Sequence, residues 1–316
     1  MQSYFTMLDL RRLRLLRELA HRGTIGAVAS ALDYSPSAVS QQLALLEKEA
    51  GVPLLERAGR NVRLTAAAQT LVGHTDALLA RVEEAEADLQ ATAEQITGTV
   101  RVATFQSAGL FLLAPALRRL AERHPALRVE VTDAEPELTM PTLALGGLDV
   151  VLADEYPFHP RPPDERLHLE PLLEERFRLV LPVDHPAARS GAPIPLSALA
   201  GDVWAVGKAD THYAELTIRA CRALGGFEPD IRHRSNDLLM LLALVANGLA
   251  VTLLPDLVRP DREPGAVARD IAEDPLTRTV SGVIRRGSER RPAVSALLQA
   301  LRETAAGLRS GATPGP

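Results

Sequence analysis

A short segment near the N-terminus presents hydroxyl and amide side chains on one side of a predicted helix. The helix is expected over 36–50, because Ser35-Pro36 supplies the residues preferred at a helix start and Gly51 suits its end. A glutamine amide can hydrogen-bond the major-groove edge of adenine, which makes Gln41 the best candidate for reading a base. A solvated helix face is the alternative interpretation. The candidate nucleic-acid contacts here are Ser35, Ser37, Ser40, Gln41 and Gln42.

Three arginines follow in a segment that is expected to form a β-hairpin. Short apolar pairs between Leu54 and Thr65 bracket a polar centre, which is typical of two short strands and a turn. The planar guanidinium pairs with phosphate oxygens in a bidentate way, so we expect contacts to phosphate rather than to bases. A solvated or ion-paired loop is the alternative. The candidate phosphate contacts are Arg57, Arg60 and Arg63.

A second group of polar residues follows a strand expected over 99–104. Phe105-Gln106-Ser107 then leads into a helix. In open α/β sheets, ligands bind beyond the carboxyl ends of the strands, where helix N-termini offer free N–H groups. Ser107 is therefore the leading candidate for contact with a small ligand, the alternative being that it only caps the helix. Weaker candidates are Thr104, Gln106, Trp204, Thr211, His212 and Asn236.

Motifs for catalysis or metal binding are missing from the sequence. It has no GxGxxG opening a helix after a strand, no GxxxxGK(S/T), no GxSxG and no HExxH, and its eight histidines do not cluster at metal-ligand spacing. We therefore expect no enzyme activity, no cofactor and no metal. A periplasmic-type ligand carrier would need a signal peptide and would leave residues 1–97 without a role. The remaining competitor is a degenerate α/β enzyme with a fused helical segment, which turnover without DNA binding would favour.

Charge is distributed unevenly along the 316 residues. The net charge of −5 argues by itself against a nucleic-acid binder. Residues 1–65, however, hold nine basic and six acidic residues, so they carry +3 and the remainder carries −8. A polyanion is expected to bind at the basic end.

Export and membrane insertion find no support in the sequence. The longest apolar stretch, 238–254, is interrupted by Asn247-Gly248 and suits a buried helix and strand rather than a span. The single cysteine, Cys221, cannot form an intramolecular disulfide, and on a helical segment it is interpreted as a packing residue. We expect a cytoplasmic protein with no membrane partner.

The elements that position the polar residues can be read from periodicity. Two short helices, beginning after Asp9 and Thr24, precede the helix over 36–50 and give it an apolar partner surface. A long helix is expected from Ala66 to about Gln95, because two heptad positions along it are mostly apolar. Such an apolar seam indicates dimerisation with the same helix of a second copy, the alternative being that the helix packs against its own domain. One heptad position holds Leu71, Leu78, Ala85 and Thr92, and the other holds Ala68, Thr75, Val82, Leu89 and Ile96.

Strands and helices alternate from Gly98 onwards, which is typical of doubly wound α/β structure. Proline-rich breaks at 157–163 and 260–264 divide this part, and the tail 310–316 is expected to be disordered. The expected strands are 99–104, 127–132, 150–153, 177–182, 203–206, 250–254 and 278–284, and the expected helices are 110–123, 139–145, 213–224, 237–246 and 292–308.

Over nearly its whole length the sequence resembles the LysR-type transcriptional regulators. The order and spacing of several segments both agree with that family. The segments that carry the resemblance are 10–23, Ala29-Ser30-Ala31-Leu32, Ser35-Pro36-Ser37-Ala38-Val39-Ser40-Gln41-Gln42-Leu43, Leu46-Glu47, Gly51-Val52-Pro53-Leu54-Leu55-Glu56-Arg57, Leu64-Thr65, Leu148-Asp149-Val150-Val151, and 245–255, which reads Val-Ala-Asn-Gly-Leu-Ala-Val-Thr-Leu-Leu-Pro.

The resemblance implies a bacterial transcription regulator with an α/β fold overall: an N-terminal winged helix-turn-helix, a long dimerisation helix and a two-lobed effector domain like periplasmic binding proteins. The implied partners are operator DNA with two-fold half-sites, a small-molecule effector, further copies of the chain in a homotetramer, and RNA polymerase. The implied domains are 1–65 for DNA binding, 66–97 for the linker helix and 98–309 for the effector domain, with lobe I at 98–157 and 276–309 and lobe II at 158–275.

Two departures from the family pattern are conservative, and one affects the ligand. Leu55 stands where relatives usually have Phe, and Ala68 where they often have Gly. Ser107 matches a serine that contacts effectors in related regulators. Glu135-Pro136 stands where some relatives carry Thr at a second contact, so their effectors cannot simply be transferred to this chain.

Overall fold

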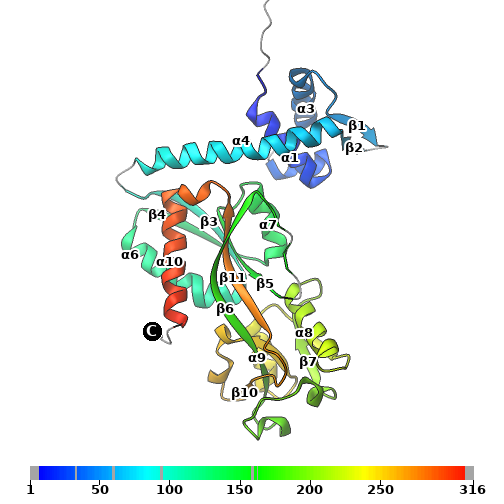
Figure 1. Cartoon of the computed structure of the whole chain (residues 1–316), viewed down its shortest axis with the longest axis vertical. Helices are drawn as coiled ribbons and strands as arrows, with labels where there is room; N and C mark the ends of the chain where they lie inside the picture. The colour runs from blue at the N-terminus through cyan, green and yellow to red at the C-terminus, as the bar shows by residue number, and fades with distance from the viewer. Residues whose placement is uncertain are drawn as a thin grey trace, which may run out of the picture. The chain divides into compact units, whose positions relative to one another are not determined.

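The computed structural model describes residues 7–32, 34–58, 61–92, 95–157, 160–161 and 163–309. The tail 310–316, for which the sequence predicts disorder, lies outside the described residues. Contacts divide the chain into two compact units, 1–88 and 89–316, shown in Figure 1. Each unit has its own apolar core, so the two are described separately.

The N-terminal unit begins with three helices whose ends follow the sequence signals. The Asp9 side chain accepts hydrogen bonds from the first turn of α1, and Gly23 ends that helix at φ 76°. Ser35 caps α3 by accepting from Ala38 N–H, and Gly51 ends it at φ 69°, a backbone conformation that suits glycine. The predicted caps of α3 are thus confirmed. The helices are α1 (Leu10–Arg22), α2 (Ile25–Leu32) and α3 (Pro36–Ala50).

A hairpin and a long helix complete this unit. Strands β1 (Leu55–Ala58) and β2 (Asn61–Leu64) pair antiparallel, as predicted for the segment between Leu54 and Thr65. Helix α4 (Ala66–Ala91) has 26 residues. Two of the predicted heptad residues, Leu78 and Leu89, are 47% and 73% exposed on it. The α4 helix therefore carries apolar side chains that its own chain leaves uncovered.

The C-terminal unit is built on a seven-stranded sheet with the order β10-β6-β11-β5-β3-β4, and β9 also pairs with β6. Parallel pairing joins β3 to β4 and to β5, whereas β6 and β11 run antiparallel to each other. The strands are β3 (Gly98–Thr104), β4 (Leu127–Asp133), β5 (Val150–Glu155), β6 (Leu167–Pro182), β9 (Thr252–Pro255), β10 (Ala266–Arg269) and β11 (Thr277–Arg285), with β7 (Val203–Val206) and β8 (Asp230–Arg234) in a separate parallel pair.

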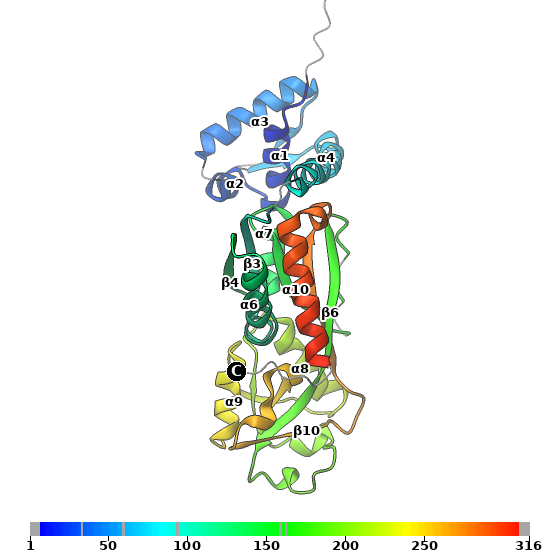
Figure 2. The same cartoon turned by 90° about the vertical axis from the view of Figure 1, so that its left-hand side faces the viewer.

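Helices α6 and α10 lie side by side in lobe I, as Figure 2 shows, whereas in lobe II α9 packs on β6 and α8 packs on β7. A π-helical turn, Gly109–Leu113, interrupts the helix that α5 begins and α6 continues. The helices are α5 (Gln106–Ala108), α6 (Ala114–Arg123), α7 (Pro136–Ala144), α8 (His212–Ala223), α9 (Leu238–Ala246) and α10 (Pro292–Arg309), with short 3₁₀ turns at Pro186–Ala188, Leu196–Leu199, Asp256–Val258, Pro260–Arg262 and Ser288–Arg290.

The long strand β6 joins two lobes. Its residues 167–176 pair with β11, and its residues 177–182 pair with β9 and β10. Lobe I contains β3, β4, β5, α6, α7 and α10, and lobe II contains β7 to β10, α8 and α9; each lobe has a separate core cluster. The sequence pattern predicted a strand only over 177–182, so the part of β6 that builds lobe I was missed.

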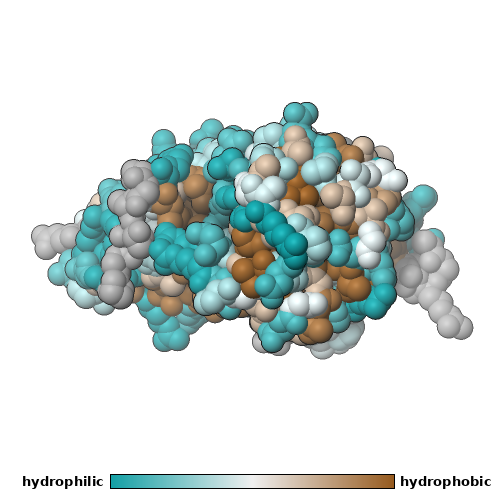
Figure 3. All heavy atoms as spheres, turned by 90° about the horizontal axis from the view of Figure 1, so that it is seen from below, coloured by the Kyte–Doolittle hydropathy of each residue, from teal (hydrophilic) through white to brown (hydrophobic). Residues whose placement is uncertain are grey.

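The surface of the chain mixes polar and apolar residues. Hydrophobic and hydrophilic side chains are interspersed over the face shown in Figure 3. No helix in the described part of the chain is long and apolar enough to cross a membrane.

Because each unit has its own core, a cavity in one core should destabilise that unit selectively. Leu16 and Leu297 are both fully buried, the first in the N-terminal core and the second in the core of lobe I. Leu16→Ala and Leu297→Ala should each cost about 2–5 kcal/mol. Scanning calorimetry of the full chain should show that each variant lowers a different transition. If both variants lowered one common transition equally, the units would not be independent.

Candidate functional site

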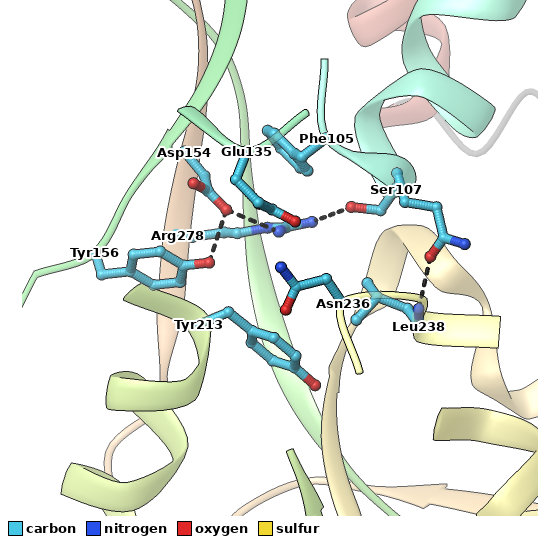
Figure 4. A pocket seen from close by; sticks show the side chains of 10 residues that line it. Phe105, Ser107, Glu135, Asp154, Tyr156, Tyr213, Asn236, Leu238 and Arg278 are labelled. Carbon is cyan, nitrogen blue, oxygen red and sulfur yellow. Dashed lines mark hydrogen bonds and ion pairs between the residues drawn. The ribbon is translucent and has the colours of Figure 1, made fainter. Parts of the chain in front are cut away.

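A pocket opens between the two lobes where β3 and β5 end and β11 begins. It encloses about 320 Å³, part of it open to solvent, and Figure 4 shows its lining side chains. The lining residues are Phe105, Gln106, Ser107, Glu135, Asp154, Tyr156, Tyr213, Asn236, Leu238 and Arg278.

A buried arginine forms the floor of this pocket. Arg278 on β11 is 3% exposed. Its Nη2 donates to Ser107 Oγ at 2.8 Å and to Glu175 Oε1 at 2.7 Å, and its Nη1 donates to Asp154 Oδ2 at 3.2 Å. Its Nε also donates to Glu175 Oε1, at 2.9 Å. The guanidinium thus ties together α5, β5, β6 and β11, and we call these four side chains the Arg278 cluster.

Neighbouring groups keep the guanidinium charged and fixed in place. Burial alone would lower the pKa of Arg278, but Glu175, Tyr156 and Asp154 together raise it above its usual value. The guanidinium also lies 5.0 Å from the ring centre of Phe105 and 5.6 Å from that of Phe177, within the range of cation–π attraction.

One carboxyl group in the pocket titrates near neutral pH. Burial, followed by the nearby charges of Asp154 and Glu137, raises the pKa of Glu135 to about 7. A hydrogen bond from the Asn236 amide opposes that rise. The Oδ1 atom of Asn236 accepts from Lys208 N–H at 2.9 Å, so its Nδ2 faces Glu135, as Figure 4 shows.

Two contacts connect the lobes beside the pocket. The Gln106 amide donates to Asp237 Oδ1 and accepts from Leu238 N–H, both at 2.6 Å. On the other side, His212 Nδ1 lies 2.9 Å from Glu137 Oε1, and His212 N–H donates to the same oxygen. Side chains of lobe I thus hold the first turns of α8 and α9 in lobe II.

Three of the residues proposed for ligand contact lie together in the pocket: Gln106, Ser107 and Asn236. The other four lie outside its lining. Thr104 is buried beside Phe105, and His212 pairs with Glu137. Trp204 lies within the core of lobe II, where its Nε1 donates to Leu199 O, and Thr211 caps α8.

Sequence reasoning did not find the Arg278 cluster or the aromatic walls. The sequence did hold a signal for Arg278. It lies two residues before the apolar Val280 on β11, so both side chains point to the same face of the strand, the one that faces the core. Glu135 was noticed only as a departure from the family pattern. Asp154 and Tyr156 left no local signal.

The polar face of α3 has the exposure expected of a surface that reads DNA. Ser37, Ser40 and Gln41 are exposed, and Ser35 Oγ lies 3.0 Å from Ser37 Oγ. Gln42 is half-buried and accepts from Arg12 Nε at 2.9 Å. The face that remains open to a ligand therefore centres on Ser37, Ser40 and Gln41.

Two of the three hairpin arginines lie in described parts of the chain. Arg57 on β1 is exposed. Arg63 on β2 is exposed and pairs with Glu56 at 2.6 Å. Arg60 lies outside the described residues. Arg57 is thus the hairpin arginine that the structure presents as a candidate phosphate contact, whereas Arg63 would have to exchange its carboxylate partner for phosphate.

Removing the buried guanidinium should damage the fold as well as the pocket. Arg278→Ala would leave Asp154 and Glu175 buried without their cation, at a cost of about 3–5 kcal/mol in the free energy of unfolding. Arg123→Ala, which removes an exposed ion pair with Glu303, is the control and should change stability very little. Urea unfolding of the two variants checks this. An Arg278→Ala variant as stable as the control would contradict the description of the cluster.

Two family models match the chain, one on each unit. The model for the bacterial regulatory helix-turn-helix protein of the LysR family matches residues 10–69, and the LysR substrate binding domain matches residues 93–306. The second match alone covers more than half of the chain.

Individual relatives agree with the family models. The probable HTH-type transcriptional regulator LrrA of Synechococcus elongatus is 26% identical over 96% of this chain and 99% of its own length. A full-length OxyR variant from Pseudomonas aeruginosa shares the fold, with 22% identity, a TM-score of 0.65 and coverage of 94% and 95%. The full-length CbnR complexed with its target DNA does so with 22% identity, a TM-score of 0.52 and coverage of 94% and 99%. The chain belongs to the LysR family of bacterial transcriptional regulators, which bind DNA through the helix-turn-helix and a small-molecule effector through the C-terminal domain.

Proposed function

We propose that this regulator reads its operator with α3 and that a small molecule in the pocket between the lobes changes operator binding. The observation that carries the proposal is the pocket itself, because its walls come from both lobes and the Gln106 contact crosses it. A ligand there would bind one arrangement of the lobes better than another. Such differential affinity is what a ligand needs in order to shift a population.

On DNA, Gln41 and the serines of α3 face the major groove, while Arg57, Arg60 and Arg63 contact phosphates. This assignment rests on the open polar face of α3 and on the positive net charge of residues 1–65. CbnR, which shares the fold, binds its target DNA.

Assembly proceeds through α4. The exposed Leu78 and Leu89 lie on predicted heptad positions and would be buried by the α4 helix of a second copy. Two copies would present two α3 helices to two-fold half-sites, and two such dimers would form the homotetramer that the family resemblance implies. An assembly of this kind bound beside a promoter would be able to contact RNA polymerase.

A thiol-based redox sensor is less well supported than a ligand pocket. Cys221 is the single cysteine in the sequence and is buried in the core of lobe II. Burial raises the pKa of its thiol to about 12. Because the thiolate is the reactive form, oxidants would find little to attack at neutral pH.

The base-reading role of Gln41 predicts a loss of specificity rather than of binding. With an operator selected from random DNA by the full-length protein, Gln41→Ala should lose about 1–3 kcal/mol of discrimination at one base pair per half-site. Arg57→Ala should instead weaken binding to all sequences and flatten the salt dependence by about one unit. Salt-dependent titrations with matched and mismatched duplexes separate the two effects. Unchanged discrimination in Gln41→Ala would mean that another residue reads the base.

The pocket role of Ser107 is tested by the smallest change to it. Ser107→Ala removes one hydroxyl group and leaves Arg278 with both carboxylates, so folding and operator affinity without effector should persist. Effector affinity should fall about three- to tenfold, the value of one hydrogen bond. Ser295→Ala, on the exposed face of α10, is the matched control. The effector is first found by screening small molecules for a changed operator footprint. If it binds the Ser107→Ala and control variants equally well, the effector site lies elsewhere.

A further inference from the structure

We propose that the ligand of the pocket is a small organic cation, a protonated amine or guanidinium group bound by Glu135 between the rings of Tyr156 and Tyr213. This inference rests on the proposed function and adds the chemical class of the effector. It follows from which hydrogen-bonding groups of the pocket are already used and which are not.

The cation that lines the pocket is not available to an anionic ligand. Every nitrogen of the Arg278 guanidinium donates within the cluster, to Ser107, Asp154 or Glu175. Tyr156 takes part in a further side-chain hydrogen bond with Arg278, so the five N–H groups of the guanidinium are all used. A carboxylate ligand could bind Arg278 only by displacing one of these buried partners. The displaced group would then be left in a low-dielectric site without its partner, which is strongly unfavourable.

Most side-chain donors of the pocket are used as well, apart from the Ser107 hydroxyl group, whose oxygen accepts from Arg278. Tyr156 O–H donates to Asp154 at 2.7 Å, and Tyr213 O–H donates to Leu253 O at 2.6 Å. The Gln106 amide is bonded to α9, and the Asn236 amide faces Glu135. What the pocket still offers is chiefly acceptor capacity on Glu135. A ligand that brings its own N–H donors fits this inventory, whereas one that brings only acceptors does not.

The balance of charge favours the same class. Two carboxylates, Asp154 and Glu175, pair with the one guanidinium of the cluster, and Glu135 adds a third carboxyl group to the lining of the pocket. Asp133 and Glu137 add negative charge from the lobe I side of Glu135. The ionisable side chains that lobe II adds near this point are those of Lys208 and Arg234, of Asp237, which accepts from Gln106, and of His212, which pairs with Glu137. Tyr156 and Tyr213 also line the pocket, where an aromatic ring can offer cation–π attraction to a ligand cation.

The titration of Glu135 gives the two ligand classes opposite pH dependence. With a pKa of about 7 in the empty pocket, Glu135 is about half protonated at neutral pH. A cation binds the ionised form, so its binding releases a proton and its affinity rises with pH. Between about pH 6 and pH 8 the ionised fraction of such a group changes about tenfold, and the affinity should change by the same factor. An anion would bind the protonated form and would show the reverse dependence.

The test uses ligands matched in length and opposite in charge. Butylamine and 1,4-diaminobutane are titrated calorimetrically into the full-length protein at pH 6 and pH 8, alongside butyrate and succinate, in two buffers of different ionisation enthalpy. We expect each amine to bind at least tenfold more tightly than the matched carboxylate, more tightly at pH 8 than at pH 6, and with proton release. Tighter binding of the carboxylates, pH-independent binding of the amines, or binding of neither class at millimolar concentration would overturn the proposal.

Two variants assign the effect to Glu135. Glu135→Gln keeps the shape of the side chain and removes its charge, so amine affinity should fall at least tenfold and lose its pH dependence. Asp133→Asn removes a nearby exposed charge and should change the affinity less than twofold. Equal losses in the two variants would mean that the effect is long-range and not a contact with Glu135.

The result also separates the ligand class from the proposed function. If succinate binds, loses affinity in Ser107→Ala and alters the operator footprint, the proposed cationic ligand class is wrong, but the regulatory role of the pocket is supported. If an amine binds through Glu135 and leaves operator binding unchanged, the ligand class stands and the regulatory role fails.

Discussion

The need to neutralise one buried guanidinium organises the C-terminal unit. An unpaired charge is prohibitively costly in a protein interior, so Arg278 must meet its acceptors wherever β11 places it. Those acceptors come from β5, β6 and the helix start after β3, which are far apart in the sequence. Satisfying one side chain therefore fixes the relative positions of the strands at the edge of the pocket.

The same requirement determines what the pocket can bind and how its lobes are coupled. Because the cluster uses the arginine and the tyrosine hydroxyl groups for its own stability, the recognition chemistry that remains is mainly carboxylate and aromatic. The lobes share the strand β6, which limits their motion. They also meet at Gln106 and at the His212–Glu137 pair, which a ligand can strengthen or displace. A rigid floor with adjustable side contacts is a suitable arrangement for a switch between two states.

The sequence predicted the locally encoded features well. The caps of α3 and the hairpin follow from turn and cap residues within a few positions of each other. Features that depend on distant partners were missed: residues 167–176 of β6 are rich in charge and contain Pro171, and the structure accommodates that proline at a β-bulge opposite Val280 and Ser281. Trp204 was a weaker ligand candidate, but it lies on β7 in the core of lobe II, because which side of a strand faces a core depends on tertiary packing. The burial of Arg278 likewise depends on carboxylates more than 100 residues away in sequence.

The central claim is that the pocket and the operator site are coupled through one protein, and the coupling can be measured from both ends. The operator Kd is determined with and without saturating 1,4-diaminobutane, and the diamine Kd is determined with and without saturating operator, all on the full-length protein. Linkage requires the two ratios to be equal, and we predict a common factor of about five or more. A diamine affinity that is the same in the presence and absence of operator would contradict the account.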